Sequence, residues 1–196
     1  MKKIFLVLAL AVSATISNAQ LFQLGIKGGL NVSNFTGGNF EAVKKKALVG
    51  VHAGAYLKFR FANFAVQPEL MVSTQGAKID SLPGVFDWKI TYINVPVMLQ
   101  YYFNRSFYLE LGPQVGFVTN QDFANSTIED FANDLDLSIA AGFGLRSKTG
   151  LGIGARYNAG LSKVGDFSPS NGIDPDFKNG VMQVSIYIPL TPSGKK

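Results

Sequence analysis

The sequence contains no cysteine and only one histidine, His52, among its 196 residues. Disulfide bonds therefore cannot stabilise the fold, so a secreted chain of this kind needs a large core or a closed hydrogen-bond ladder instead. A transition-metal site has few ligands to draw on. The spacing along the chain also nominates no serine as a partner for His52 in a catalytic triad. We predict no catalytic, metal or cofactor site.

Charge of either sign is scarce, because Asp, Glu, Lys and Arg together make up 16% of the chain. Without Lys2 and Lys3, 16 basic residues remain against 13 acidic ones. The largest basic cluster, 44–46, suits a solvated loop tip better than a nucleic-acid surface. Nucleic acid is not an expected partner.

Long hydrophobic runs are absent after the N-terminal region. There, the apolar run Ile4–Val12 follows two lysines and precedes a small polar stretch, with Ser17 and Ala19 at the −3 and −1 positions of a cleavage site. This layout is typical of a cleavable signal peptide, and the run is about half of the ~20 residues that a membrane-spanning helix needs. We predict a signal peptide over residues 1–19 and a single domain over 20–196. Any membrane insertion of that domain must use β-strands.

Period-two alternation of apolar and polar residues recurs along this domain, whereas helical spacing is poor. In the first segment, Leu24 and Ile26 alternate with Gly25 and Lys27. Each segment is long enough for a transmembrane strand, which needs roughly 9–11 residues. Eight strands are predicted: Phe22–Ser33, Val49–Arg60, Phe64–Gln75, Trp88–Phe103, Phe107–Thr119, Asp136–Arg146, Gly150–Ser162 and Val181–Leu190.

The connections between these segments alternate in length. Four long ones, rich in Gly, Asn, Asp and Ser, alternate with three short ones. This pattern predicts an all-β fold, an eight-stranded antiparallel up-and-down transmembrane β-barrel in the bacterial outer membrane, with both termini in the periplasm. The predicted long connections are Asn34–Leu48, Gly76–Asp87, Asn120–Leu135 and Lys163–Gly180, and the short ones are Phe61–Asn63, Asn104–Ser106 and Ser147–Thr149.

Alternation alone does not say which face of a strand points into a barrel. A secreted, soluble, lipocalin-like barrel would turn the apolar faces inward around a ligand. However, the polar faces carry many glycines, which suit a narrow interior. Aromatic residues also cluster at the short turns, as Phe59, Phe61 and Phe64 do, and this is typical of an interfacial girdle. Both observations favour polar faces inward and apolar faces toward lipid.

Three prolines, Pro68, Pro96 and Pro113, fall inside predicted strands, where each removes a hydrogen-bond donor from the ladder. We expect β-bulges to absorb them.

Four short motifs resemble the PorT-like family of small outer-membrane β-barrel proteins of Gram-negative bacteria. They are Gly25–Phe35, Val66–Gln75, Tyr92–Phe103 and Leu111–Gly116. The resemblance implies an eight-stranded barrel of the OmpA/OmpX type that resides in the outer membrane, and the family carries prolines at matching strand positions. It implies no general activity. The chain departs from the family pattern at its end, which runs Thr-Pro-Ser-Gly-Lys-Lys instead of closing on an aromatic residue.

Inward-facing charges are expected to meet inside the barrel. Lys27, Glu69 and Arg156 lie at similar heights when positions are counted from the periplasmic ends of their strands. An unpaired charge buried in so narrow a space costs several kcal/mol. We therefore predict an ionic plug that fills the lumen, in which Glu69 and Glu110 face Lys27, Arg146 and Arg156.

Acidic residues gather in the third long connection, but they do not match the spacing of a dedicated calcium loop. A solvated loop is the better interpretation of Asp122, Glu129, Asp130 and Asp134.

The preferred functional prediction is a non-enzymatic outer-membrane barrel, surrounded by lipid, with a structural role or a protein partner bound through its outward loops. The alternative of a narrow, porin-like channel requires a continuous polar lumen instead of a plug. The candidate contact residues are apolar and lie at or near the long connections: Phe35, Phe40, Leu82, Phe86 and Phe123.

Overall fold

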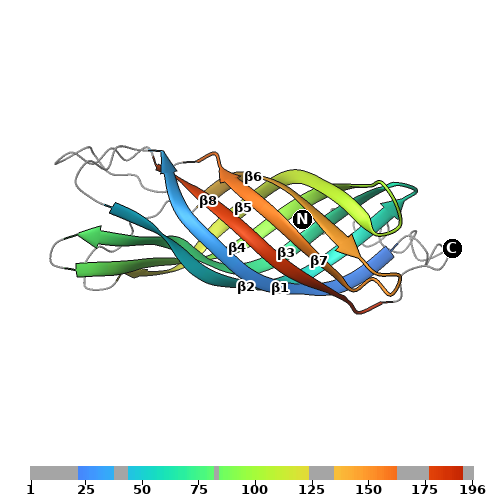
Figure 1. The fold of residues 1–196 in the computed structure, drawn as a ribbon, viewed down its shortest axis with the longest axis horizontal. Helices are drawn as coiled ribbons and strands as arrows, with labels where there is room; N and C mark the ends of the chain where they lie inside the picture. Colours follow the sequence, from blue (N-terminus) through green and yellow to red (C-terminus); the bar gives the residue numbers. More distant parts are fainter. Residues whose placement is uncertain (1–21, 38–43, 82–83, 124–134, 163–176, 192–196) are drawn as a thin grey trace, which may run out of the picture.

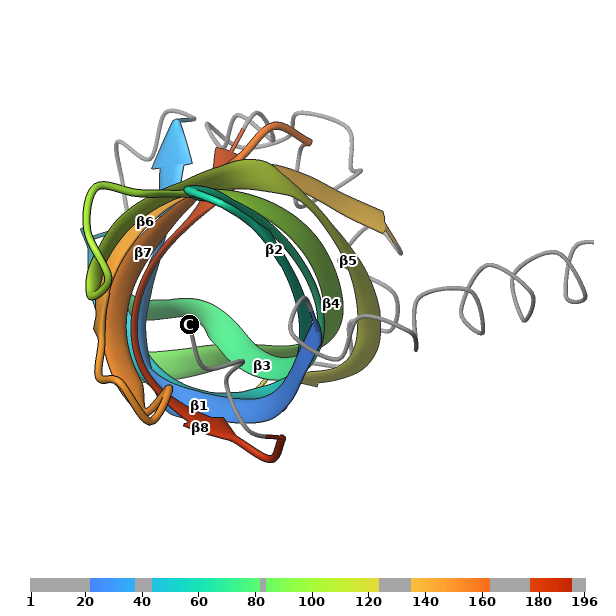
Figure 2. The ribbon, with the colours of Figure 1, turned by 90° about the vertical axis from the view of Figure 1, so that its right-hand side faces the viewer.

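The computed structural model describes residues 22–37, 44–81, 84–123, 135–162 and 177–191. In these segments, eight antiparallel strands form one closed barrel (Figures 1 and 2). Each strand pairs with its neighbours in the chain, and the last strand returns to pair with the first. The predicted fold class is therefore confirmed. None of the described segments contains a helix long and apolar enough to cross a membrane.

Each of the eight predicted segments coincides with one strand of the barrel over most of its length. The main difference is that most strands run further than predicted at the ends away from the short turns. The strands are β1 (Phe22–Gly37), β2 (Lys44–Phe61), β3 (Phe64–Ser81), β4 (Gly84–Tyr102), β5 (Phe107–Phe123), β6 (Leu135–Arg146), β7 (Gly152–Gly160) and β8 (Phe177–Pro189).

The wall of the barrel has an apolar outside and a polar inside. On β1, Leu30 is 58% exposed and its neighbour Asn31 is fully buried. On β3, Leu70 is 58% exposed and Glu69 only 4%. The lipocalin-like alternative requires the opposite orientation and is wrong for this chain. A continuous apolar exterior of this kind fits the hydrocarbon interior of a membrane.

The three short turns, the beginning of β1 and the end of β8 lie at the same end of the barrel, which we call the short-turn end. The turns comprise residues 62–63, 103–106 and 147–151, so their lengths differ from the predicted three residues each. Outward-facing aromatic pairs surround this end, including Phe22 with Phe59 and Phe64 with Tyr101, whose ring centroids are 5.6 and 5.1 Å apart. The predicted aromatic clustering is therefore present in the structure.

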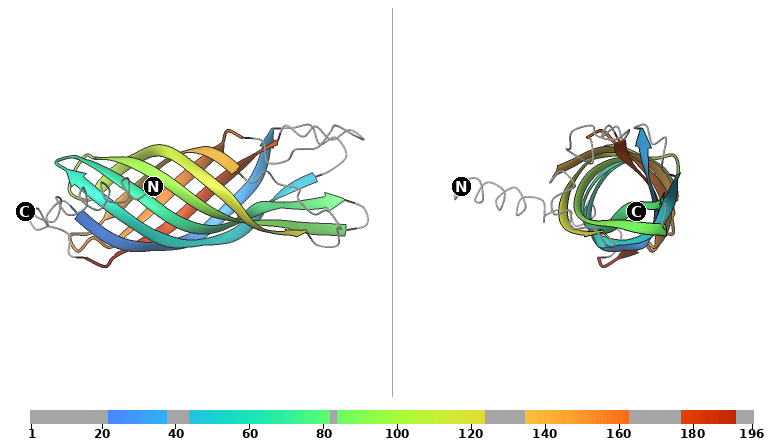
Figure 3. Two further views of the ribbon diagram at one scale, coloured as in Figure 1. Left: turned by 180° about the vertical axis from the view of Figure 1, so that it is seen from behind. Right: turned by 90° about the vertical axis from the view of Figure 1, so that its left-hand side faces the viewer.

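The opposite end, which we call the long-connection end, differs from the prediction in one important respect. The segment Gly76–Asp87 is not a long loop, because β3 and β4 continue as a hairpin and only residues 82–83 separate them. β2 and β5 extend along the two sides of this hairpin. Beyond Ser33, β1 pairs with β8 and no longer with β2. At this end, β1 therefore stays with β8, whereas β2 stays with β3, β4 and β5. The hairpin of β3 and β4 projects beyond the closed barrel (Figures 1 and 3).

The three strand prolines interrupt the ladder without shifting its register. The β2–β3 pairing skips Pro68, the β3–β4 pairing skips Pro96 and the β4–β5 pairing skips Pro113, and in each case the register resumes unchanged. The expected bulges at the prolines are therefore wrong. In each case the skipped pairing is with the preceding strand, while the pairing with the following strand continues at the proline. A residue without an N–H can occupy such a position at the loss of one ladder bond.

Candidate functional site: the charged interior of the barrel

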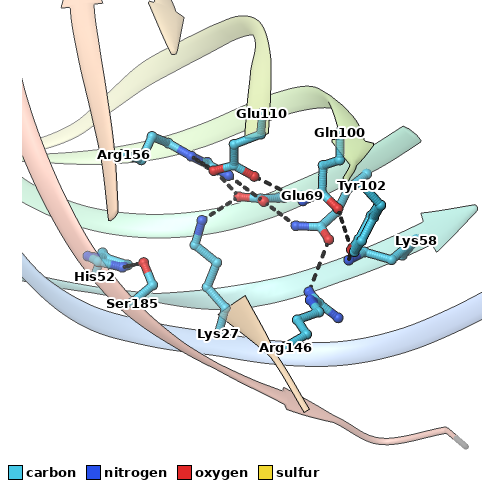
Figure 4. A network of polar contacts seen from close by, with 11 residues as sticks. Lys27, His52, Lys58, Glu69, Gln100, Tyr102, Glu110, Arg146, Arg156 and Ser185 are labelled. Carbon is cyan, nitrogen blue, oxygen red and sulfur yellow. Dashed lines mark hydrogen bonds and ion pairs between the residues drawn. The ribbon is translucent and has the colours of Figure 1, made fainter. Parts of the chain in front are cut away.

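Four charged side chains from four different strands meet across the middle of the lumen. We call this group, Lys27, Glu69, Glu110 and Arg156, the ionic layer (Figure 4). The Arg156 guanidinium donates two hydrogen bonds to Glu69, at 2.9 and 2.8 Å, and a third at 2.8 Å from Nε to Glu110. The Lys27 Nζ donates to Glu69 at 2.9 Å. All four side chains are at most 4% exposed, so they are screened from water.

Two glycines explain how side chains from alternate strands reach one another. Gly142 on β6 lies between Glu110 on β5 and Arg156 on β7. A Cβ atom at Gly142 would lie 2.5 Å from the Ala155 carbonyl oxygen and 3.0 Å from Arg156 Cα. The absence of a side chain there lets the two charges meet across the strand.

Gly54 has a comparable position on the other side of the barrel. It is paired with Lys27 of β1, whereas Glu69 of β3 is paired with Tyr56, two residues further along β2. A Cβ atom at Gly54 would overlap the Leu70 carbonyl oxygen. The Lys27–Glu69 pair therefore crosses β2 beside a glycine, and the Glu110–Arg156 pair crosses β6 directly at one.

Arg146, predicted as a partner of the two glutamates, does not contact either carboxylate. Its guanidinium donates to the Gln23 side-chain carbonyl at 2.8 Å and to that of Gln67 at 3.3 Å. Gln67 in turn donates to Glu69 at 2.7 Å. Arg146 is thus linked to the ionic layer only through an amide. The structure does not bring Arg146 into direct contact with the carboxylates, because it is the last residue of β6 and lies nearer to the short-turn end.

Lys58 reaches the ionic layer through a longer relay. Its Nζ donates to the Tyr102 hydroxyl at 2.6 Å, and that hydroxyl donates to the Gln100 side-chain carbonyl at 3.1 Å. The Gln100 amide then donates to Glu110 at 2.9 Å. Glutamine and tyrosine residues therefore connect the carboxylates to two further cations. These links were not predicted from the sequence, because nothing in the sequence distinguishes one uncharged polar residue on an inward face from another.

Four tyrosines fill the short-turn half of the lumen and form what we call the tyrosine layer: Tyr56, Tyr102, Tyr108 and Tyr187. The rings pack against each other at centroid distances of 5.9 Å for Tyr56 with Tyr187 and 5.1 Å for Tyr102 with Tyr108. Gly25 and Gly144 make room for them, since a Cβ atom at either position would overlap a tyrosine ring. The inward position of these tyrosines follows from strand parity, but their gathering into one layer does not.

On the other side of the ionic layer lies a neutral group that we call the histidine layer: Asn31, His52, Ser73 and Ser185. The Asn31 amide nitrogen donates to Ser73 Oγ at 2.8 Å and to the backbone carbonyls of Val51 and Thr74. Its side-chain oxygen must therefore accept from His52 Nδ1, 2.6 Å away. His52 Nε2 is then left to accept the Ser185 hydroxyl proton at 2.8 Å.

Ser185 is a serine partner of His52 that the sequence did not predict, because the two residues are 133 positions apart in the chain. The order of hydroxyl, imidazole and amide is the one that activates a serine nucleophile. However, Ser185, His52 and Asn31 are each at most 3% exposed, so the hydroxyl presents no surface to a substrate. The contacts of this layer satisfy buried polar groups inside the wall.

Three of the five predicted contact residues fall in described strands, at the long-connection end. Phe35 falls in β1, Phe86 in β4 and Phe123 in β5, so these three belong to strands and not to loops; their side chains lie outside the described part. Phe40 and Leu82 are outside the described residues, as are three of the four acidic residues of the third connection. Asp122 belongs to β5. No group of three or more potential metal ligands occurs within the described segments.

Comparisons with known proteins agree with this architecture. A family model described as "Outer membrane protein beta-barrel domain" matches residues 18–166. The fold is similar to that of Neisserial surface protein A, with a TM-score of 0.53 and 12% identity over 84% of this chain and 96% of that one. It is also similar to OprG from Pseudomonas aeruginosa, with a TM-score of 0.49 and 14% identity over 87% and 94% of the two chains. No relative with curated annotation matches the sequence. The family and the apolar exterior place the protein in the bacterial outer membrane.

Proposed function

The chain belongs to the family of outer membrane protein β-barrel domains, and from this premise we propose that it is a non-enzymatic barrel, closed to solutes, that acts through its long-connection end. The observation that carries the proposal is the ionic layer. Glu69 and Glu110 hold Arg156 from two sides, and Lys27 completes the crossing of the lumen. A solute would have to separate these groups in order to pass.

Separating them is expensive. Removing one partner of a buried ion pair costs about 3–5 kcal/mol, because the remaining charge is left without compensation. The tyrosine layer fills the next section of the lumen with four buried rings. The two layers together support a closed barrel over the alternative of a narrow channel.

The proposed orientation places the short-turn end in the periplasm and the long-connection end outside the cell, as is usual for barrels of this kind. Among the described segments, the projecting hairpin of β3 and β4, with β2 and β5 along its sides, is then the most prominent outward feature. Within the described pairings, β5 has no partner on its β6 side beyond Phe117. Such a strand edge offers backbone groups to a protein partner.

The absence of cysteine permits a direct test of this orientation. A single cysteine replaces exposed Asn120 on β5, or exposed Lys148 in the third short turn, and intact cells are treated with a membrane-impermeant maleimide. We expect labelling of Asn120→Cys in intact cells, and labelling of Lys148→Cys only after the outer membrane is permeabilised. The reverse pattern would contradict the proposed orientation.

Two finer assignments remain part of the proposal. The motifs that resemble the PorT-like family support membership of that group within the broader family. The N-terminal pattern supports removal of residues 1–19 on export. The mass of the protein purified from outer membranes tests the second point, because cleavage predicts a chain that begins at Gln20.

Single-channel recording in planar lipid bilayers tests the closed lumen. The wild-type protein should show no stable open level. The double variant Lys27→Ala/Glu69→Ala, which removes one pair without changing the net charge, should produce measurable openings. Leu70→Ala on the outward face of the same strand serves as the control and should stay closed. A stable, large conductance of the wild-type protein would overturn the proposal and favour the channel.

A further inference from the structure

The interior of the barrel contains more positive than negative charge. Four buried cations are associated with the ionic and tyrosine layers, namely Lys27, Lys58, Arg146 and Arg156, whereas only two carboxylates are. The third buried acid, Asp136, bonds to Ser162 near the long-connection end, away from these layers. Lys27 and Arg156 form direct ion pairs with the two carboxylates. The surplus of two positive charges therefore belongs to Lys58 and Arg146.

These two cations lie beside the same aromatic ring. Lys58 Nζ is 5.4 Å from the Tyr108 ring centroid, and the Arg146 guanidinium carbon is 5.9 Å from it. They are 4% and 6% exposed, and no described carboxylate lies within ion-pair distance of either. Contacts with ring faces offset only part of the cost of burying a cation. A bound anion would offset the remaining cost of burying two like charges in one section of the lumen.

A second observation points to the same place. Arg146 Nε is buried and has no hydrogen-bond acceptor among the described residues, and neither has the side-chain nitrogen of Gln23. The two groups are neighbours, since Arg146 donates to the Gln23 side-chain oxygen at 2.8 Å. Gln23 is 7% exposed, so water does not freely satisfy its amide. The site therefore has unused donors as well as unbalanced charge.

We propose that this cluster, Gln23, Lys58 and Arg146 beside Tyr108, binds a phosphate-type oxyanion at the short-turn end of the lumen. Gln23 and Tyr108 are the second residues of β1 and β5, Arg146 is the last residue of β6, and Lys58 is paired with Gln23, so the cluster lies at the short-turn end of the lumen. A guanidinium, an ammonium and an amide together supply the donors that a tetrahedral oxyanion accepts. The inference does not depend on the proposed role of the long-connection end.

The oxyanion has two possible sources, free phosphate and the headgroup of a phospholipid, and the experiment separates them. In the first arm, inorganic phosphate is titrated calorimetrically into the full-length mature protein in octyl glucoside, which carries no phosphate. In the second arm, native mass spectrometry records whether phosphatidylglycerol stays bound. The variants are Arg146→Gln and Lys58→Gln, and Lys148→Gln is the matched control because it removes an exposed positive charge from the same end.

We expect one saturable oxyanion per barrel for the wild-type protein and for Lys148→Gln. Affinity should fall at least tenfold in Arg146→Gln and in Lys58→Gln, and it should fall with added sodium chloride. Binding of inorganic phosphate identifies a free anion, and retention of the lipid alone identifies a headgroup. The proposal is overturned if neither ligand binds, or if Lys148→Gln weakens binding as much as Arg146→Gln. Lys58→Gln keeps the test decisive if Arg146→Gln does not fold.

Discussion

The ionic layer and the histidine layer fill adjacent sections of one lumen with different chemistry. In the ionic layer, long side chains from β1, β3, β5 and β7 cross the barrel and depend on partners from other strands. In the histidine layer, Asn31 and His52 also bond to side chains of other strands, but these partners are short and uncharged, and Asn31 bonds to backbone carbonyls as well. In the ionic layer, the loss of one charged group leaves another buried charge without its partner. In the histidine layer, the loss of one neutral group leaves no unpaired charge, so it should matter less.

The largest expected effect is that of Glu69→Gln. This change removes the charge that pairs with both Lys27 and Arg156, and it leaves Arg156 with only Glu110. The free energy of unfolding should fall by about 3–5 kcal/mol. Urea unfolding in lipid vesicles, followed by the fluorescence of the single tryptophan, measures it. The control Asp136→Asn makes the same chemical change to a buried acid that is bound to a hydroxyl and not to a cation, so a loss as large as that of Glu69→Gln would show that the effect does not come from the ion pairs.

An intermediate effect is expected from Gly142→Ala. The added methyl group would press on the Ala155 carbonyl and the Arg156 backbone at the point where Arg156 reaches Glu110. Overpacking of this kind costs about 1–3 kcal/mol. Gly28→Ala is the matched control, because a Cβ atom there would lie 3.4 Å from its nearest neighbour, an ordinary contact. Equal stability of the two variants, measured by the same unfolding assay, would show that the glycine is not what lets the charges meet.

The smallest effect is expected from Ser185→Ala in the histidine layer. The change removes one hydrogen bond to His52 Nε2 and leaves the bond from His52 to Asn31 in place. The expected loss is about 0.5–1.5 kcal/mol, the usual net value of a single hydrogen bond. If Ser185→Ala destabilises the barrel as much as Glu69→Gln does, then the charge of the ionic layer is not what makes its contacts more important.

Much of the fold was predictable because alternation is a local property of the sequence. The order of residues such as Leu24, Gly25, Ile26 and Lys27 determines which side chains share a face, and the eight segments followed from it. The glycines on the polar faces and the aromatic residues at the short turns were enough to predict which face points inward. The lengths of the strands were harder to predict from the sequence. The residues 76–87 are rich in loop formers, yet pairing between β3 and β4, and of residues 77–80 with β2, extends them as a hairpin.

The interior was predictable in its composition and less so in its contacts. Counting residues from strand ends placed Lys27, Glu69 and Arg156 at one level, and these three do meet. The same counting could not place Arg146, because the stagger between strands of a tilted barrel is not written in any single segment. Contacts that join distant strands, such as that of His52 with Ser185, depend on how the barrel closes. No local sequence pattern predicts these contacts.

A double-mutant cycle between Glu69 and Arg156 tests the central claim most directly. The unfolding free energies of Glu69→Gln, Arg156→Gln and the double variant are compared with that of the wild-type protein. Because the two groups share two hydrogen bonds in a buried site, we predict a coupling energy of at least about 1.5 kcal/mol, in the range measured for close charge pairs. The double variant should therefore be less destabilised than the sum of the single ones. Strictly additive effects would mean that the two side chains do not meet, and the sealed lumen would lose its basis.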